Sequence, residues 1–139
     1  MPEVTAAMLR HVLTTTKRIA VVGASNKPDR PSYEVMQFLI AQGFDVTPVN
    51  PTLAGGKILD RPVVATLEEA GPLDMVDIFR NSADAAAPVE DAIRLGAQTV
   101  WMQLGVINHA AAATAREAGL NVIMDHCPAI EMPRLGLAK

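Results

Sequence analysis

Short runs of mostly apolar residues alternate along this chain with longer segments of helical periodicity, and this alternation restricts the possible folds. The runs are Arg18–Gly23, Asp45–Val49, Met75–Phe79, Thr99–Met102 and Asn121–Met124. They are apolar at successive positions rather than at every second position. Such runs are typical of strands in a parallel sheet that is covered by helices on both faces.

The segments between the runs carry helix start and stop signals. The predicted helices run from Pro31 or Ser32 to a stop at Gly43, from Pro88 to a stop at Gly96, from an Asn108 cap through Ala110–Ala118, and from Val4 to Thr15. The segment 51–72 is less regular, and one short strand is expected there near Pro62–Val64. This order of elements predicts the α/β class: a Rossmann-like, doubly wound parallel sheet in three layers.

Length and composition indicate one domain. The chain has 139 residues, and 1–139 is interpreted as a single domain on which a helix within residues 1–16 packs. Half of the residues are apolar, but no apolar run approaches the roughly 18 residues that a membrane span needs. The first residues do not resemble a secretion signal, so a cytoplasmic location is expected.

Charge and residue types exclude several function classes. The net charge is −3 and the aromatics are one Trp, one Tyr and three Phe, which argues against a nucleic-acid partner. No group of Cys and His residues has the spacing of a metal site. No nucleophile, base and carboxylate form a convincing catalytic set, so a non-catalytic role is favoured over an enzyme. The expected partner is a small molecule, and no protein partner can be named.

The loop after the first strand is the strongest candidate for a phosphate site. Gly23 permits a tight turn, and the small Ala24 and Ser25 leave room for a phosphate against backbone N–H groups. Lys27 and Arg30 add two cations, and Ser32, at the start of the predicted helix, completes the candidate cofactor-binding residues of this loop. Only one glycine of the dinucleotide fingerprint G-x-G-x-x-G is present, so an ordinary polar loop remains the alternative.

The ends of the later strands supply further candidates, because ligands bind beyond the carboxyl ends of such strands. Asn50 can hydrogen-bond a ribose or an adenine, with the flat ring of Pro51 beside it, although Asn-Pro also commonly ends a strand. Phe79 and Arg80 offer an aromatic ring and a cation, although Phe79 could equally be a core residue. Another candidate group follows the run at 99–102: Gln103, Leu104 and Gly105.

Together these segments resemble the stand-alone CoA-binding protein family, whose fold is shared with the CoA-binding domain of the succinyl-CoA synthetase α subunit. The resemblance rests on Val21–Ser25 with Arg30–Tyr33, on Pro48–Pro51, on Trp101–Val106 and on Met124–Pro128. It implies coenzyme A as the cofactor. It also implies that Gly23, Ala24 and Ser25 line the nucleotide, that Lys27 and Arg30 meet phosphates, that Asn50 and Pro51 flank the adenosine, and that Phe79, Arg80, Gln103, Leu104 and Gly105 complete the crevice.

Two functional hypotheses follow. The first is a module that binds CoA or an acyl-CoA and acts as a carrier, sensor or partner subunit. The second is an NAD(P)-binding enzyme or redox sensor on the same fold, against which the missing carboxylate after the second strand argues. Cys127 is the single cysteine. It is interpreted as a small packed hydrophobe, with the alternative that it lies within reach of the CoA thiol.

Overall fold

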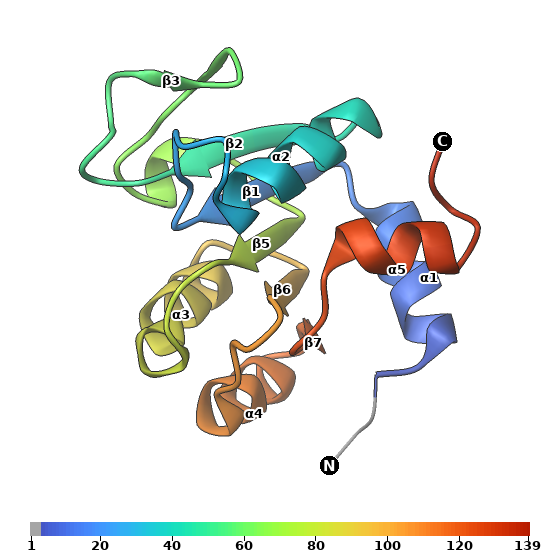
Figure 1. Ribbon diagram of the computed structural model, residues 1–139. Helices are drawn as coiled ribbons and strands as arrows, with labels where there is room; N and C mark the ends of the chain where they lie inside the picture. The colour runs from blue at the N-terminus through green and yellow to red at the C-terminus, as the bar shows by residue number, and fades with distance from the viewer. Residues whose placement is uncertain (1–3) are drawn as a thin grey trace.

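The computed structural model describes residues 4–139, in which a parallel sheet of five strands lies between two layers of helices (Figure 1). The strands are β1 (Arg18–Val22), β2 (Asp45–Val49), β5 (Met75–Ile78), β6 (Thr99–Met102) and β7 (Asn121–Ile123). Their order is β2-β1-β5-β6-β7, and each neighbouring pair is parallel. The predicted doubly wound sheet is confirmed, and all five strands lie within one residue of their predicted bounds.

The order in which the chain adds strands to the sheet reverses between β1 and β5. From β1 the chain proceeds outward to β2, returns to β5 on the other side of β1, and then continues away through β6 and β7. The loops that follow β1 and β5 therefore diverge and leave a crevice at the carboxyl ends of these two strands.

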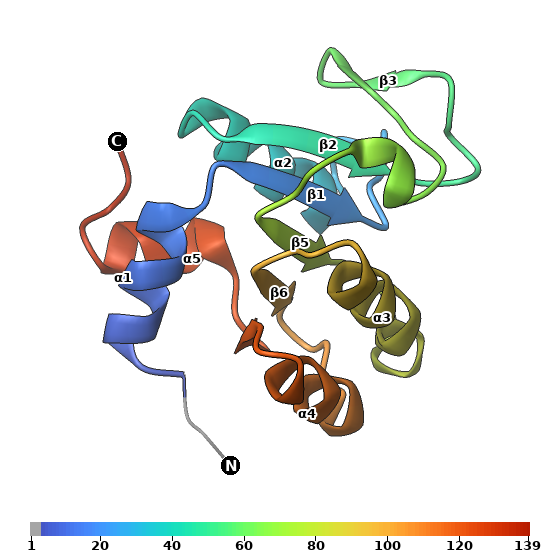
Figure 2. The same ribbon diagram turned by 180° about the vertical axis from the view of Figure 1, so that it is seen from behind.

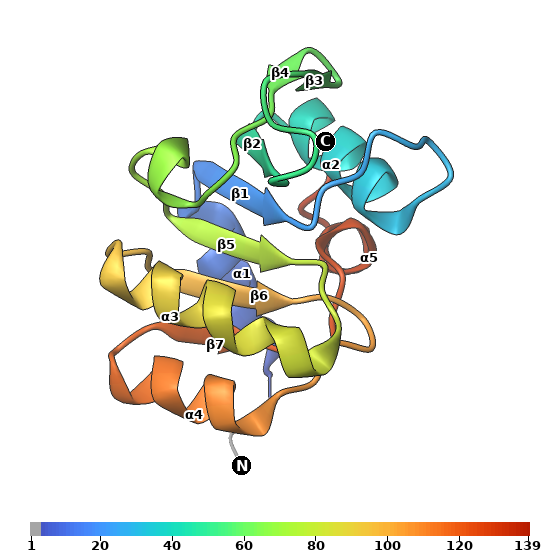
Figure 3. The same cartoon turned by 90° about the vertical axis from the view of Figure 1, so that its left-hand side faces the viewer.

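Helices cover both faces of the sheet (Figures 2 and 3). The first face carries α1 (Ala6–Thr15), α2 (Pro31–Ala41) and α5 (Pro128–Arg134), and the second carries α3 (Ala86–Arg94) and α4 (His109–Glu117). Successive strand residues face opposite layers: Ile19 packs in the core of the first face and Ala20 in the core of the second. Both faces are thus buried, which explains the continuous apolar runs in the sequence.

The predicted caps are largely observed. Asn108 accepts a hydrogen bond from the Ala111 N–H at the start of α4, and Thr5 caps α1, which begins at Ala6 rather than at Val4. Pro88 does not open α3. The helix begins at Ala86 after a 3₁₀ turn (Ser82–Ala85), and Pro88 occupies its first turn, where its missing N–H removes no intrahelical bond.

Two features differ from the predictions. The strand expected at 62–64 is reduced to β4 (Arg61–Pro62), which pairs with β3 (Lys57–Ile58) in a small antiparallel hairpin, and to a single parallel bridge between Val64 and Val49. Helix α5 was not predicted, because its two prolines are ordinarily signals of loops. The longest described helix, α2, has 11 residues, and none between residues 4 and 139 is long and apolar enough to cross a bilayer.

Candidate functional site

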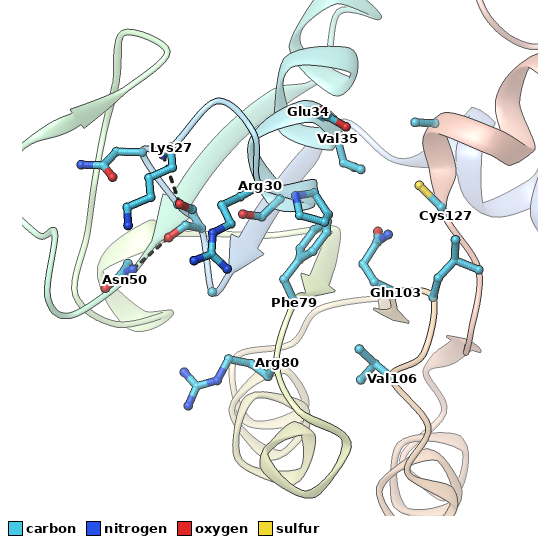
Figure 4. A pocket seen from close by; sticks show the side chains of 18 of the residues that line it. Lys27, Arg30, Glu34, Val35, Asn50, Phe79, Arg80, Gln103, Val106 and Cys127 are labelled. Atoms are coloured by element: carbon cyan, nitrogen blue, oxygen red, sulfur yellow. Dashed lines mark hydrogen bonds between the residues drawn. The ribbon is translucent and has the colours of Figure 1, made fainter.

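A cavity of about 950 Å³ opens at the carboxyl ends of the strands, in the crevice between β1 and β5 (Figure 4). Eleven of the thirteen residues predicted from the sequence line it: Gly23, Ala24, Ser25, Lys27, Arg30, Ser32, Asn50, Phe79, Arg80, Gln103 and Leu104. The fold thus brings together loops that are separated by up to about 80 residues along the chain.

The ends of β1 and β5 approach each other closely at Gly23. Its φ is +83°, and a Cβ atom at this position would lie 2.1 Å from the carbonyl oxygen of Phe79. The Phe79 N–H donates to the carbonyl of Val22 at 2.9 Å, so the two strand ends are also tied by a hydrogen bond. Only a residue without a side chain fits at this close approach of the two strands.

The loop after β1 leads directly into the first turn of α2. The Ser25 hydroxyl oxygen accepts a hydrogen bond from the Lys27 N–H at 3.1 Å, which folds the loop back on itself. Arg30 stands at the N-cap of α2 and its side chain does not cap the helix. Ser32, at 5% exposure, lines the cavity from the first turn. A helix N-terminus that faces a cavity favours an anionic ligand.

Three cations surround this end of the cavity. Lys27, Arg30 and Arg80 all line it, and Figure 4 shows them on the same side, with Asn50 between the loops. Within residues 4–139 none of the three cations forms an ion pair, whereas four other arginines do. Glu34 is the single carboxylate of the cavity wall. The cations are therefore available to a ligand that carries several negative charges.

The other end of the cavity is apolar. Its walls come from the ends of β5 and β6 and from the start of α5: Phe79, Leu104, Val106, Cys127, Ala129 and Ile130. Leu104 and Ile130 are 57% and 52% exposed, although large apolar side chains are usually buried. The cavity thus joins a cationic region to an apolar one.

Asn50 ties two loops together. Its side-chain nitrogen donates to the carbonyl of Ala24 at 2.8 Å, and its side-chain oxygen accepts from the Thr52 N–H at 2.8 Å. The amide oxygen is thus already engaged at the cavity wall. The contact of Asn50 with a ribose or adenine stays a prediction, which one remaining N–H could satisfy.

Two predicted residues lie outside this cavity. Pro51 lines a second cavity of about 420 Å³ on the side of α3, which shares Gly23, Asn50, Thr52 and Arg80 with the first. Gly105 lines neither cavity. Its N–H donates to the Asp125 carboxylate at 2.7 Å and its carbonyl accepts from the Ser82 hydroxyl at 3.2 Å, so it is held in a turn.

A buried carboxylate lies behind the cavity wall. Asp77 is fully buried on β5, and this burial raises the pKa of its carboxyl group well above the ordinary value. Gln103 follows β6, lines the cavity and is 5% exposed. With its amide nitrogen turned inward, Gln103 donates to the two carboxylate oxygens of Asp77 at 2.8 and 3.1 Å.

Several residues of the site were missed in the sequence. Val35 of α2, Val106 after β6, and Ala129 and Ile130 of α5 line the cavity, and none of them carries a local signal for binding. The single signal that could have identified the Asp77–Gln103 pair is the polar residue in an otherwise apolar strand. Within the described residues, no group of three or more His, Cys, Asp or Glu side chains could hold a metal ion.

Most of the chain is similar to known proteins. Residues 17–133 match the family described as CoA binding domain. The uncharacterised protein YneT of Bacillus subtilis is 37% identical over 128 residues, which are 91% of this chain and 93% of YneT.

Solved structures are similar over nearly the whole chain. A hypothetical protein from Pyrococcus horikoshii OT3 has a TM-score of 0.90 at 36% identity and covers 97% of this chain and 99% of its own. A protein from Thermus thermophilus has a TM-score of 0.89 at 33% identity, with coverage of 95% and 99%. The structure of RSP in complex with beta-NADH shares the fold alone, with a TM-score of 0.58 at 19% identity over 80% of this chain and 54% of RSP.

Proposed function

Because this chain belongs to the family of CoA-binding domains, we propose that it binds coenzyme A or an acyl-CoA in the cavity between β1 and β5. The resemblance that the sequence suggested is thereby confirmed at the level of the family. The proposal adds the ligand, the place of binding and the role: a binding module, sensor or partner subunit in the cytoplasm, without chemistry of its own.

One observation carries the proposal: the same cavity has free cations at one end and an apolar wall with a buried amide at the other. CoA has a matching polarity, because its nucleotide half carries a pyrophosphate and a 3′-phosphate, whereas its pantetheine arm is neutral and contains two amides. Lys27, Arg30 and Arg80 are suited to the phosphates. Gln103 lies at the neutral end, where it can meet an amide.

The size of the cavity supports a long ligand. Its volume of about 950 Å³ lies near the upper end of the range that is usual for small-molecule pockets, roughly 300–1,000 Å³. The second cavity adjoins it at Gly23 and Arg80 and offers further space near Pro51 on the opposite face of the sheet. We therefore expect the adenosine end of the ligand to extend from the first cavity into the second, across the place between β1 and β5 where the order of the strands reverses.

An NAD(P) ligand is the competing proposal, because a protein of the same fold has been solved with NADH. The end of β2 argues against it. NAD sites of this type place a carboxylate there to bind the ribose hydroxyls, and this chain has Asn50, whose side chain holds the neighbouring loops.

Titration calorimetry of the purified protein with CoA, NADH and NADPH tests the proposal. We expect CoA to bind more tightly than either dinucleotide, and mass spectrometry of the small molecules released by heat to detect CoA or an acyl-CoA. Tight binding of NADH or NADPH, without measurable binding of CoA, would overturn the assignment.

A further inference from the structure

Asp77 is a fully buried carboxylate to which the proposed binding of CoA assigns no role. It lies on β5, between Val21 of β1 and Trp101 of β6 in the sheet register. It faces the layer of α2 and α5, on the same face of the strand as Met75. It does not line the cavity. Burial of a carboxylate lowers the stability of the fold unless the group is hydrogen-bonded. The presence of Asp77 therefore needs an explanation.

The partner of Asp77 is the amide of Gln103. One end of this amide lies within hydrogen-bonding distance of both carboxylate oxygens, at 2.8 and 3.1 Å. An ionised carboxylate only accepts hydrogen bonds, so the amide nitrogen has to be the atom that faces it. The opposite orientation would place the amide oxygen against two other oxygens. The ionised form of Asp77 therefore fixes which end of Gln103 is turned inward.

We propose that Asp77 is a positioning residue: it holds the nitrogen of Gln103 inward, so that the amide oxygen is presented to the cavity and selects a ligand group that donates a hydrogen bond. This inference rests on the proposed function, and the N–H groups of a pantetheine arm are donors of the required kind. Figure 4 shows the side chain of Gln103 extending toward the cavity, on the same side as Cys127.

Protonation of Asp77 reverses this arrangement. A protonated carboxyl group can donate to the amide oxygen, so the amide can turn and present its nitrogen to the cavity. Burial raises the pKa of Asp77, which brings this change closer to neutral pH. The affinity for a donor-bearing ligand should therefore fall as the pH is lowered through the pKa of Asp77.

Other ionisable groups near the cavity have to be considered as sources of a pH effect. Those in its wall are Lys27, Arg30, Glu34, Arg80 and Cys127. Outside the wall, Tyr33 lies on α2, His126 precedes α5, and Glu131 of α5 is paired with Arg134. Within residues 4–139 none of these groups forms a hydrogen bond or an ion pair with Asp77, and burial is the one cause that raises its pKa. The pH effect of Asp77 is thus separable by mutation.

The test is a double-mutant cycle with Asp77→Asn and Gln103→Met, read out by calorimetric titration with CoA at neutral pH. Asparagine presents one acceptor and one donor, so it no longer selects an orientation of Gln103. We expect each single variant to bind CoA about threefold to tenfold more weakly than the wild type, and the double variant to equal Gln103→Met. Losses that multiply in the double variant, or unchanged affinity in Asp77→Asn, would overturn the proposal.

The matched control is Asp74→Asn. Asp74 immediately precedes β5, at the amino-terminal end of the strand and thus away from the cavity. It accepts hydrogen bonds from the N–H groups of Lys17 and Arg18 at 3.0 and 2.9 Å. This variant should be less stable without a change in CoA affinity. Dephospho-CoA serves for the pH series, because it lacks the 3′-phosphate that titrates near pH 6. Its affinity should depend on pH more steeply in the wild type than in Asp77→Asn.

A readout without ligand separates this inference from the proposed function. In the NMR spectrum of the free protein, the side-chain amide protons of Gln103, assigned by their absence in Gln103→Met, should shift with pH in the wild type but not in Asp77→Asn. If Asp77→Asn does not fold, the wild-type pH series answers the question: the Gln103 signals shift as Asp77 ionises, or their insensitivity refutes the idea. If CoA does not bind but the Gln103 signals still depend on pH, the proposed ligand is wrong, whereas the interaction between Asp77 and Gln103 is supported.

Discussion

Substitution of Gly23 by alanine should destabilise the protein far more than an ordinary glycine-to-alanine change in a turn. The new Cβ atom would lie 2.1 Å from the Phe79 carbonyl oxygen and 3.2 Å from Cδ of Arg80. The contact with oxygen involves backbone rather than a flexible side chain, so β1 and β5 would have to separate by about 1 Å to restore van der Waals distance.

The cost has two parts. The φ of +83° is unfavourable for alanine by about 1–2 kcal/mol. Separation of packed strands adds about 1–3 kcal/mol, by comparison with overpacked cores. The sum of about 2–5 kcal/mol is a large part of the roughly 5–15 kcal/mol by which domains are stable. With an m-value of about 2 kcal/mol/M, the midpoint of urea unfolding should fall by about 1–2.5 M.

Gly96→Ala is the matched control. Gly96 has a φ of +80°, and a Cβ atom there would meet nothing within 4 Å. This variant should lose only the stability that the unfavourable φ of alanine costs, about 1–2 kcal/mol. Urea unfolding followed by far-ultraviolet circular dichroism compares the two variants. If Gly23→Ala loses no more stability than Gly96→Ala, the close approach of β1 and β5 is not what requires glycine at position 23.

Three further predictions concern the cavity. Arg30→Ala should weaken CoA binding by about 1–3 kcal/mol through the loss of a charge-assisted contact, and unchanged calorimetric affinities for CoA and dephospho-CoA would exclude Arg30 from the site. Burial raises the pKa of Asp77 in the folded state, so the unfolded chain loses this proton first as the pH rises. The wild type should then lose stability relative to Asp77→Asn between the unfolded and the folded pKa, and urea titrations from about pH 4 to pH 8 that show a constant difference would contradict this. Cys127 is 6% exposed and lines the apolar end; its thiolate should attack CoA disulfide to form a protein–CoA mixed disulfide and release one CoA thiolate. Intact-mass spectrometry should detect a reducible adduct that is absent in Cys127→Ser, and unmodified wild type that still binds CoA would show that the thiol only packs.

The strands, most helices and the strand ends at which the cavity opens were readable from the sequence, because they follow from local patterns. Unbroken apolar runs reflect burial on both faces, and Gly23 with the cations Lys27 and Arg30 marks the first strand end. Helix α5 was missed, because its prolines at 128 and 133 are loop signals, and this short helix is stabilised by packing against α1 and α2 in the core of the first face.

Which strand ends and side chains converge was decided by the tertiary structure. Gly105, like Gly23, is a glycine that follows a strand, but its N–H donates a hydrogen bond to the carboxylate of Asp125, 20 residues away, and this contact holds it in a turn outside the cavity. Asp77 and Gln103 meet because β5 and β6 are neighbours in register, and no local pattern specifies strand order. The periodicity of a segment records whether it is buried, whereas its partners depend on how the whole sheet assembles.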